Sequence, residues 1–272
     1  MSHNHHNHGM GTSGIWEMWS PYQFVVILVL GFFYYQILKK SGQAVPFYHP
    51  GLFLLGLSLY FLCLGSPLNY YGHHYLLSAH MLQQAVLYYI VPPLLILGIP
   101  KEIWESLVQT KWISKLMETH MLLTLIAFDI LFSLYHLPLV FNTVMTNYPV
   151  MVFTHSILFI FAIQMWWPII GPLPELNQTS ELKKMAYILL GAILITPSCA
   201  LIIFADKPIY EAYFGAPQIF EWLPSMDDQQ LGGVLMKFVQ ELSYGSAIAF
   251  IFFRWYKREK MLDADLNGPQ ER

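Results

Sequence analysis

Long apolar stretches, separated by short polar connections, run through nearly the whole sequence. Each stretch has about 16–24 residues and few charges, which is the length that an α-helix needs to cross a bilayer. The pattern predicts an all-α, polytopic membrane protein with seven transmembrane helices. We expect the spans at about 16–38, 50–65, 75–98, 119–141, 150–172, 184–205 and 231–254.

Basic residues lie in every second connection, and this alternation predicts the orientation. The other connections carry only Lys207, which lies beside Asp206. Because cytoplasmic loops are enriched in lysine and arginine, we expect the N-terminus outside and the C-terminus inside a cell membrane. No lysine or arginine precedes the first span, so a cleaved signal peptide is not expected. The residues that set the orientation are Lys39, Lys40, Lys101, Lys111, Lys115, Lys183, Lys184, Lys257, Arg258 and Lys260.

The expected organisation is one transmembrane domain, 16–256, between a His-rich segment, 1–15, and a cytoplasmic tail, 257–272. The first ten residues, MSHNHHNHGM, contain four histidines. Such a tract binds metals, and it is also typical of an expression tag. Both interpretations stay open, and no site residue is taken from this segment.

Composition excludes several classes of function. The chain is 56% hydrophobic and only 11% charged, against about 25% charged residues in soluble domains. It has no Lys/Arg-rich tract, so nucleic-acid binding is not expected. It lacks a Walker A motif and the common hydrolase and redox motifs. Because the connections are too short for a catalytic domain, we do not expect an enzyme.

Three histidines are predicted to lie inside the membrane at a similar depth. His80, His136 and His155 belong to three different spans, each about five residues from the outer end. An ionisable side chain in a bilayer is costly and is functional by default. The alternative is that each imidazole only bonds a neighbouring helix. Gln83 and Gln84 lie on the same helix face as His80.

The donor types in this outer half favour copper. Imidazole suits copper, zinc, iron and nickel, and thiolate or thioether donors add a preference for Cu(I). Asp129, seven residues before His136, could orient that ring or carry protons. The cysteines could instead be buried small side chains or form a disulfide, and the methionine could be packing material. The auxiliary candidates are Cys63, Cys199, Met151, His73, Asp129 and Asp228.

The last span carries two further features. Gly232 and Gly233 are expected to let it approach another helix closely. Lys237 and Glu241, at positions i and i+4, form either a neutralising pair or part of a path for protons or cations.

Several segments, in this order, resemble the CtaG family of seven-span cytochrome c oxidase assembly factors of Gram-positive bacteria. The resemblance covers about 65–255, and it depends on the order and spacing of motifs that are weak individually. The segments are His80-Met81-Leu82-Gln83-Gln84, Pro92-Pro93-Leu94-Leu95, Gly98-Ile99-Pro100, Tyr135-His136-Leu137-Pro138, His155 with Trp166-Trp167-Pro168-Ile169 and Gly171-Pro172, Pro208-Ile209-Tyr210 and Asp228-Gln229-Gln230-Leu231-Gly232-Gly233.

The resemblance implies a role in maturing a caa-type oxidase, with copper, as Cu(I), supplied to the catalytic subunit. It implies that His80, His136 and His155 are the metal ligands and that the partners are oxidase subunits and the lipid bilayer. Lys237 departs from the family's pattern and argues against a copper role for Met236. Whether several copies associate stays open.

Two other functions fit the residues. Histidines on facing helices could ligate haem in an electron carrier, or Asp129, Lys237 and Glu241 could line the path of a metal or proton transporter. A scaffold that binds no metal is the remaining alternative.

Overall fold

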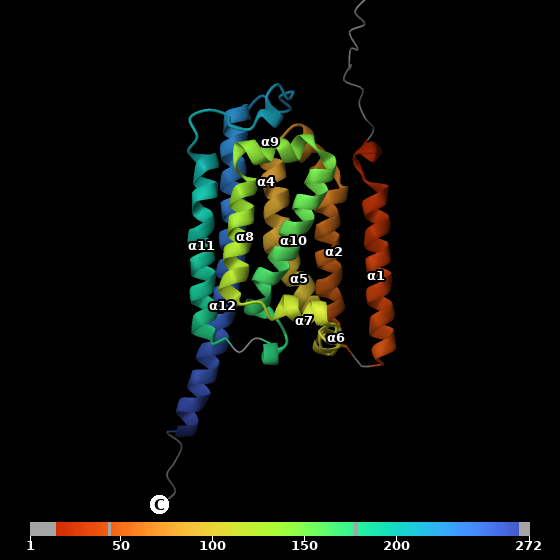
Figure 1. Cartoon of the computed structure of the whole chain (residues 1–272), viewed down its shortest axis with the longest axis vertical. Coiled ribbons are helices and arrows are strands. Elements are labelled where there is room, and N and C mark those ends of the chain that lie inside the picture. Colours follow the sequence, from red (N-terminus) through yellow and green to blue (C-terminus); the bar gives the residue numbers. More distant parts are fainter. Residues whose placement is uncertain (1–14, 43–44, 177–178, 267–272) are drawn as a thin grey trace, which may run out of the picture.

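The computed structural model describes residues 15–42, 45–176 and 179–266, and every regular element in these ranges is a helix (Figure 1). Six helices are long and apolar enough to cross a membrane, and a seventh crossing is present if the bent pair α7–α8 is one span. This confirms the all-α, polytopic membrane fold. The direction in which the helices cross stays a prediction, and the four N-terminal histidines lie outside the described residues.

Long helices form the bundle, and shorter ones lie across its two ends (Figure 1). The long axis is followed by α1 (Pro21–Ser41), α2 (Tyr48–Gly65), α4 (Leu77–Ala85) with η2 (Val86–Ile90) and α5 (Val91–Gly98), α8 (Met121–Tyr135), α10 (Tyr148–Ile170), α11 (Glu181–Ile203) and α12 (Ser225–Leu266). The shorter helices are η1 (Ile15–Met18), α3 (Pro67–His74), α6 (Lys101–Leu107), α7 (Lys111–Met117), α9 (Pro138–Thr146), η3 (Pro174–Leu176) and η4 (Glu211–Tyr213).

The helix α8 differs most from the sequence-based expectation. The span predicted at 119–141 begins as expected, just after an 85° bend that separates α7 from α8, but α8 ends at Tyr135, well before 141. Pro138 has no backbone N–H and disfavours a helical conformation in the residue before it. It therefore starts a new helix, α9, and His136 is the C-cap residue of α8 rather than a residue within its last turns.

The third span contains a π-helical turn, η2, followed by Pro92 and Pro93. Because proline has no N–H, Pro92 leaves the carbonyl of Tyr88, four residues earlier, without its helical partner, and the indole of Trp166 donates to this carbonyl at 3.1 Å. Near the end of α5, the indole of Trp104 donates to the carbonyl of Ile96 at 3.1 Å. Aromatic side chains of α10 and α6 thus stabilise an irregular span.

Small residues bring α12 close to two neighbours. A Cβ on Gly232 would lie 3.1 Å from the side chain of Met81, and one on Gly233 would lie 2.7 Å from that of Ile203. The expected close approach at these glycines is confirmed, because α12 packs tightly against α4 and α11 here. The packing aligns the start of α12 with the start of α4, where His80 lies.

Candidate functional site

The structure gathers the predicted histidines around one tyrosine that the sequence analysis did not single out. His80 lies in the first turns of α4, His136 caps α8, and His155 lies on α10. His80 and His136 are 2% and 0% exposed, while His155 is partly buried. Tyr135, itself 1% exposed, lies among them. We refer to His80, Tyr135, His136 and His155 as the histidine site.

The hydroxyl of Tyr135 joins two of the three imidazoles. Its oxygen lies 2.7 Å from Nε2 of His80 and 3.3 Å from Nε2 of His155. The centroids of these two rings are 6.2 Å apart. A hydroxyl carries a single proton, so one of the two nitrogens accepts this proton and the other donates its own to the phenol oxygen. The two imidazoles therefore converge on one point inside the bundle.

His136 leaves one ring nitrogen without a partner. Its Nδ1 lies 2.8 Å from the carbonyl of Phe132, and a carbonyl can only accept, so Nδ1 carries the proton. In the neutral ring Nε2 then holds a bare lone pair. This atom is buried and has no hydrogen-bond partner among the described residues. Metal-binding histidines show the same arrangement, with the second nitrogen donating to a carbonyl.

The amides and histidines near His80 divide between the site and its surroundings. Nε2 of Gln84 lies 3.4 Å from Nε2 of His155, so Gln84 borders the site. Gln83 instead donates to the side-chain oxygen of Asn69 at 2.9 Å. His74 is exposed, and its Nδ1 donates to the carbonyl of Tyr70 at 2.9 Å. His73, on the preceding helix α3, is partly buried beside His74.

Asp228 fixes the helix that carries His80. Its carboxylate accepts the N–H of Leu77 at 2.7 Å, the N–H of Ser78 at 3.2 Å and the hydroxyl of Ser78. These groups belong to the first turn of α4, whose N–H donors have no partners within the helix. Asp228, a candidate auxiliary ligand in the sequence analysis, is thus engaged as a cap supplied from α12.

The loop before α12 supports the site from the other side. The hydroxyl of Tyr210 donates to the carbonyl of His136 at 2.8 Å. Burial raises the pKa of Tyr210, so the hydroxyl keeps the proton that it donates. Gln229 accepts the N–H of Ile209 at 2.8 Å and thereby holds this loop. These contacts fix the backbone at the end of α8, where both Tyr135 and His136 lie.

The other candidate ligands do not join the histidine site through any contact in the described ranges. Cys63 and Cys199 are 1% and 2% exposed and are not bonded to each other. Asp129 is 3% exposed, and neither carboxylate oxygen has a hydrogen-bond partner among the described residues. Met151 packs against the hydrophobic core. Within those ranges, no three His, Cys, Asp or Glu side chains lie close enough to hold one metal ion.

Lys237 and Glu241 form the expected pair. Their charged atoms are 2.6 Å apart, and Lys237 also donates to the side chain of Gln240 at 2.9 Å and to the carbonyl of Ala192 at 3.1 Å. The ammonium is satisfied by neighbours on α11 and α12, which agrees with a neutralising role.

Comparison with known proteins gives a match at the level of families. The family model described as cytochrome c oxidase caa3 assembly factor matches residues 26–258. The match includes the complete histidine site and Asp228. No curated protein and no solved structure matches the chain.

Proposed function

Because the chain belongs to the family of cytochrome c oxidase caa3 assembly factors, we propose that it binds copper at the histidine site and supplies it to the catalytic subunit of the oxidase. As a multi-pass membrane protein of this family, it acts with the oxidase in a lipid bilayer. Copper is the cargo in this proposal. The role is non-catalytic, since the protein takes up and releases an ion without transforming a substrate.

The unpartnered Nε2 of His136 is the observation that carries the proposal. A buried polar atom without a hydrogen bond costs free energy, about 1–3 kcal/mol for a typical donor or acceptor. A bare imidazole lone pair is a good ligand for copper, so a bound ion would remove this cost. The contact between Nδ1 and the carbonyl of Phe132 already sets the required tautomer.

His80 and His155 supply the other donors. Their Nε2 atoms already point to a common position, which the hydroxyl of Tyr135 occupies. Metal–imidazole bonds are about 2.0 Å long, shorter than either present contact, so the rings move inward and Tyr135 moves aside when copper binds. Tyr135 therefore competes with copper for these two nitrogens, and this competition keeps the site able to exchange its ligands.

His155 gives the site an exit toward a partner. It is the least buried of the three histidines, and Val152, three residues earlier and so on the same face of α10, is 46% exposed. This side of the site therefore lies at the surface of the bundle that contacts lipid. A recipient whose copper centre is itself within the membrane could receive the ion here by lateral contact.

A copper titration of the purified full chain tests the proposal. The four N-terminal histidines, His3, His5, His6 and His8, are first replaced by alanine so that they do not contribute. We expect one copper ion per chain and an affinity at least roughly tenfold lower in H136A. The matched control is H74A, which removes an exposed histidine and should bind as the parent does.

The H80A and H155A variants extend the test. Both should weaken copper binding and lower oxidase activity in cells, with unchanged amounts of the protein in the membrane. If all three variants bind copper as tightly as H74A does, the histidine site is not the copper site. A Soret band in the purified parent, with no bound copper, would instead favour the haem carrier.

A further inference from the structure

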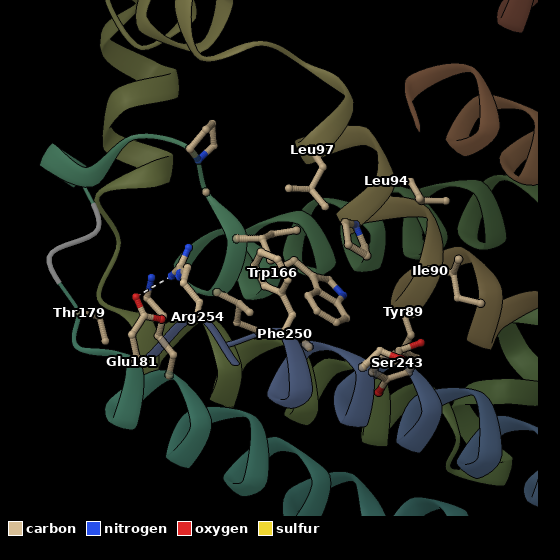
Figure 2. A pocket seen from close by; sticks show the side chains of 18 of the residues that line it. Tyr89, Ile90, Leu94, Leu97, Trp166, Thr179, Glu181, Ser243, Phe250 and Arg254 are labelled. Carbon is tan, nitrogen blue, oxygen red and sulfur yellow. Dashed lines mark hydrogen bonds and ion pairs between the residues drawn. The ribbon is translucent and has the colours of Figure 1, made fainter. Parts of the chain in front are cut away.

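A second site lies toward the opposite end of the bundle from His80. A cavity of about 890 Å³ opens between α5, α10, α11 and α12, and Figure 2 shows apolar side chains from several helices around it. Its volume falls within the range of sites for small molecules, about 300–1,000 Å³. We refer to this space, with its charged residues Glu181, Lys184, Arg254 and Arg258, as the cationic cavity.

The cavity follows from the irregular third span. After the π-helical turn and Pro92-Pro93, α5 packs mainly against α2 and α10, whereas α12 packs mainly against α4 and α11. The helices α5 and α12 therefore diverge after η2, toward the end of the bundle away from His80. On the α12 side the wall contains the small residues Ser243, Ser246 and Ala247, which do not fill the space that the divergence leaves.

The walls are apolar, and they continue onto the outer surface of the bundle. Ile90, Leu94 and Leu97 line the cavity on one side and Phe250 lines it on another (Figure 2). Leu97 is 39% exposed and Phe250 is 60% exposed, so the cavity opens where the protein meets the hydrocarbon of the bilayer. A molecule that enters by this route has an apolar part.

The charged rim has more cations than anions. Arg254 forms an ion pair with Glu181 at 2.5 Å, which Figure 2 shows as a dashed line. This pair engages Oε1 of the single carboxylate among the lining residues, and Lys184 and Arg258 carry further positive charge. The cavity therefore has a net positive rim.

Lys184 has the carboxylate of Glu181 as its neighbouring anion, and that carboxylate already pairs with Arg254. Lys184 is 6% exposed and lines the cavity, yet no hydrogen bond or ion pair between described residues involves its ammonium. Burying an unpaired charge is costly, and such groups are normally paired. The position of this ammonium calls for an anion inside the cavity.

We propose that the cationic cavity binds an anionic phospholipid. Its phosphate lies against Lys184, with Arg254 and Arg258 nearby, and one acyl chain lies along Leu94, Leu97 and Phe250. By the predicted orientation this is the cytoplasmic end, and basic pockets between helices on that side bind anionic headgroups. A partner's transmembrane helix, about 10–12 Å wide with its side chains, covers a surface and does not enter such a cavity.

The test compares two phospholipids with identical acyl chains on the full-length protein in detergent. Native mass spectrometry measures the binding of phosphatidylglycerol, which is anionic, and phosphatidylcholine, which is zwitterionic. We expect at least one phosphatidylglycerol to bind in clear preference. K184Q should reduce this preference roughly fivefold, the effect of one cationic side chain at an anionic surface.

Lys183→Gln is the matched control, because it removes the same charge from an exposed neighbour that does not line the cavity. It should leave the preference unchanged. Equal effects of K183Q and K184Q, or equal binding of both lipids by the parent, would overturn the proposal. K184Q removes a buried ammonium that makes no hydrogen bond among the described residues and should fold as the parent does, which thermal unfolding checks.

A second variant tests the apolar part of the cavity without changing charge. Ala247→Phe places a large side chain in the cavity wall and should reduce binding of phosphatidylglycerol, whereas Ala249→Phe, at an exposed position outside the lining, should not. Unchanged binding in A247F would contradict the proposed position of the acyl chain. The lipid site is independent of copper, so K184Q and A247F should bind copper as the parent does.

Discussion

The histidine site and the cationic cavity both place polar groups among apolar side chains, and they differ in the sign of what is left unpaired. At the histidine site it is a lone pair, on Nε2 of His136. In the cationic cavity, Oε2 of Glu181 also lacks a hydrogen bond among the described residues, but cations outnumber this one carboxylate, and the ammonium of Lys184 makes no hydrogen bond or ion pair there. A buried lone pair favours a cation, and a buried ammonium favours an anion. Burial alone therefore does not define a site; the unpaired group determines which ligand fits.

The two regions also differ in packing. Around His80 and His136, contacts from Asp228, Tyr210 and Tyr135 fix the backbone and the rings. Around Lys184, diverging helices leave an open volume. The first arrangement suits a small ion that needs defined ligand positions, and the second suits a flexible amphiphile.

The largest expected effect is a loss of copper binding that leaves lipid binding unchanged, which would separate the two sites by their ligands. H136A should lower copper affinity at least roughly tenfold and leave the preference for anionic lipid unchanged, because the two sites share no residue. Copper titration and native mass spectrometry on the same preparation measure both. A loss of both activities in H136A, at unchanged thermal stability, would show that the two ends are coupled.

The next largest effect concerns the free energy of unfolding, through the cap of α4, the helix that carries His80. D228A removes the acceptor for two backbone N–H groups and a hydroxyl at the start of α4, and we expect the free energy of unfolding to fall by about 2–4 kcal/mol. Thermal unfolding in detergent measures this change. D227A, at an exposed neighbouring position, should change stability by less than about 0.5 kcal/mol. Similar losses in both variants would argue against the capping role.

A smaller effect is expected from two glycines of α12. G232A places a Cβ 3.2 Å from the backbone of Ser78 and should cost about 1–3 kcal/mol by forcing α4 away. G245A meets nothing within 4 Å and should stabilise the helix by up to about 1 kcal/mol. Unfolding of the two variants side by side checks the sign of each change. Stabilisation by G232A would contradict the close packing of α4 and α12.

The smallest effect is expected at Tyr135. Y135F removes the hydroxyl that contacts His80 and His155, so copper should bind a few-fold more tightly, by about 1 kcal/mol. Competition between copper and a chelator measures this shift. Weaker binding in Y135F would mean that the phenol oxygen supports the ion rather than competing with it.

The sequence predicted the spans well because bilayer thickness sets their length. It misplaced the end of α8, since the apolar pattern continues across Pro138 while the backbone cannot continue as one helix. The histidines were identifiable as costly intramembrane groups, but the central position of Tyr135 was not. No polar residue lies one helical turn before or after Tyr135 to mark it. Its role depends on the rings of His80 and His155, from α4 and α10, which come near each other only in the folded bundle.

The roles of two charged residues, Asp228 and Lys184, could likewise not be predicted from the sequence alone. Asp228 looked like an auxiliary ligand because it is acidic and lies near the predicted outer end, and only the packing of α12 against α4 reveals its three donors. Lys184 counted as one of several loop lysines that set orientation. Its burial in a cavity depends on the divergence of α5 and α12, which no local pattern around 184 encodes.

X-ray absorption spectroscopy of the copper-loaded full chain, with the four N-terminal histidines replaced, tests the copper site most directly. The account predicts imidazole nitrogens at about 2.0 Å, with one nitrogen fewer in H136A and no change in H74A. A copper ion surrounded by sulfur at about 2.3 Å, with a spectrum that is the same in H136A, would contradict it and move the site to the cysteines.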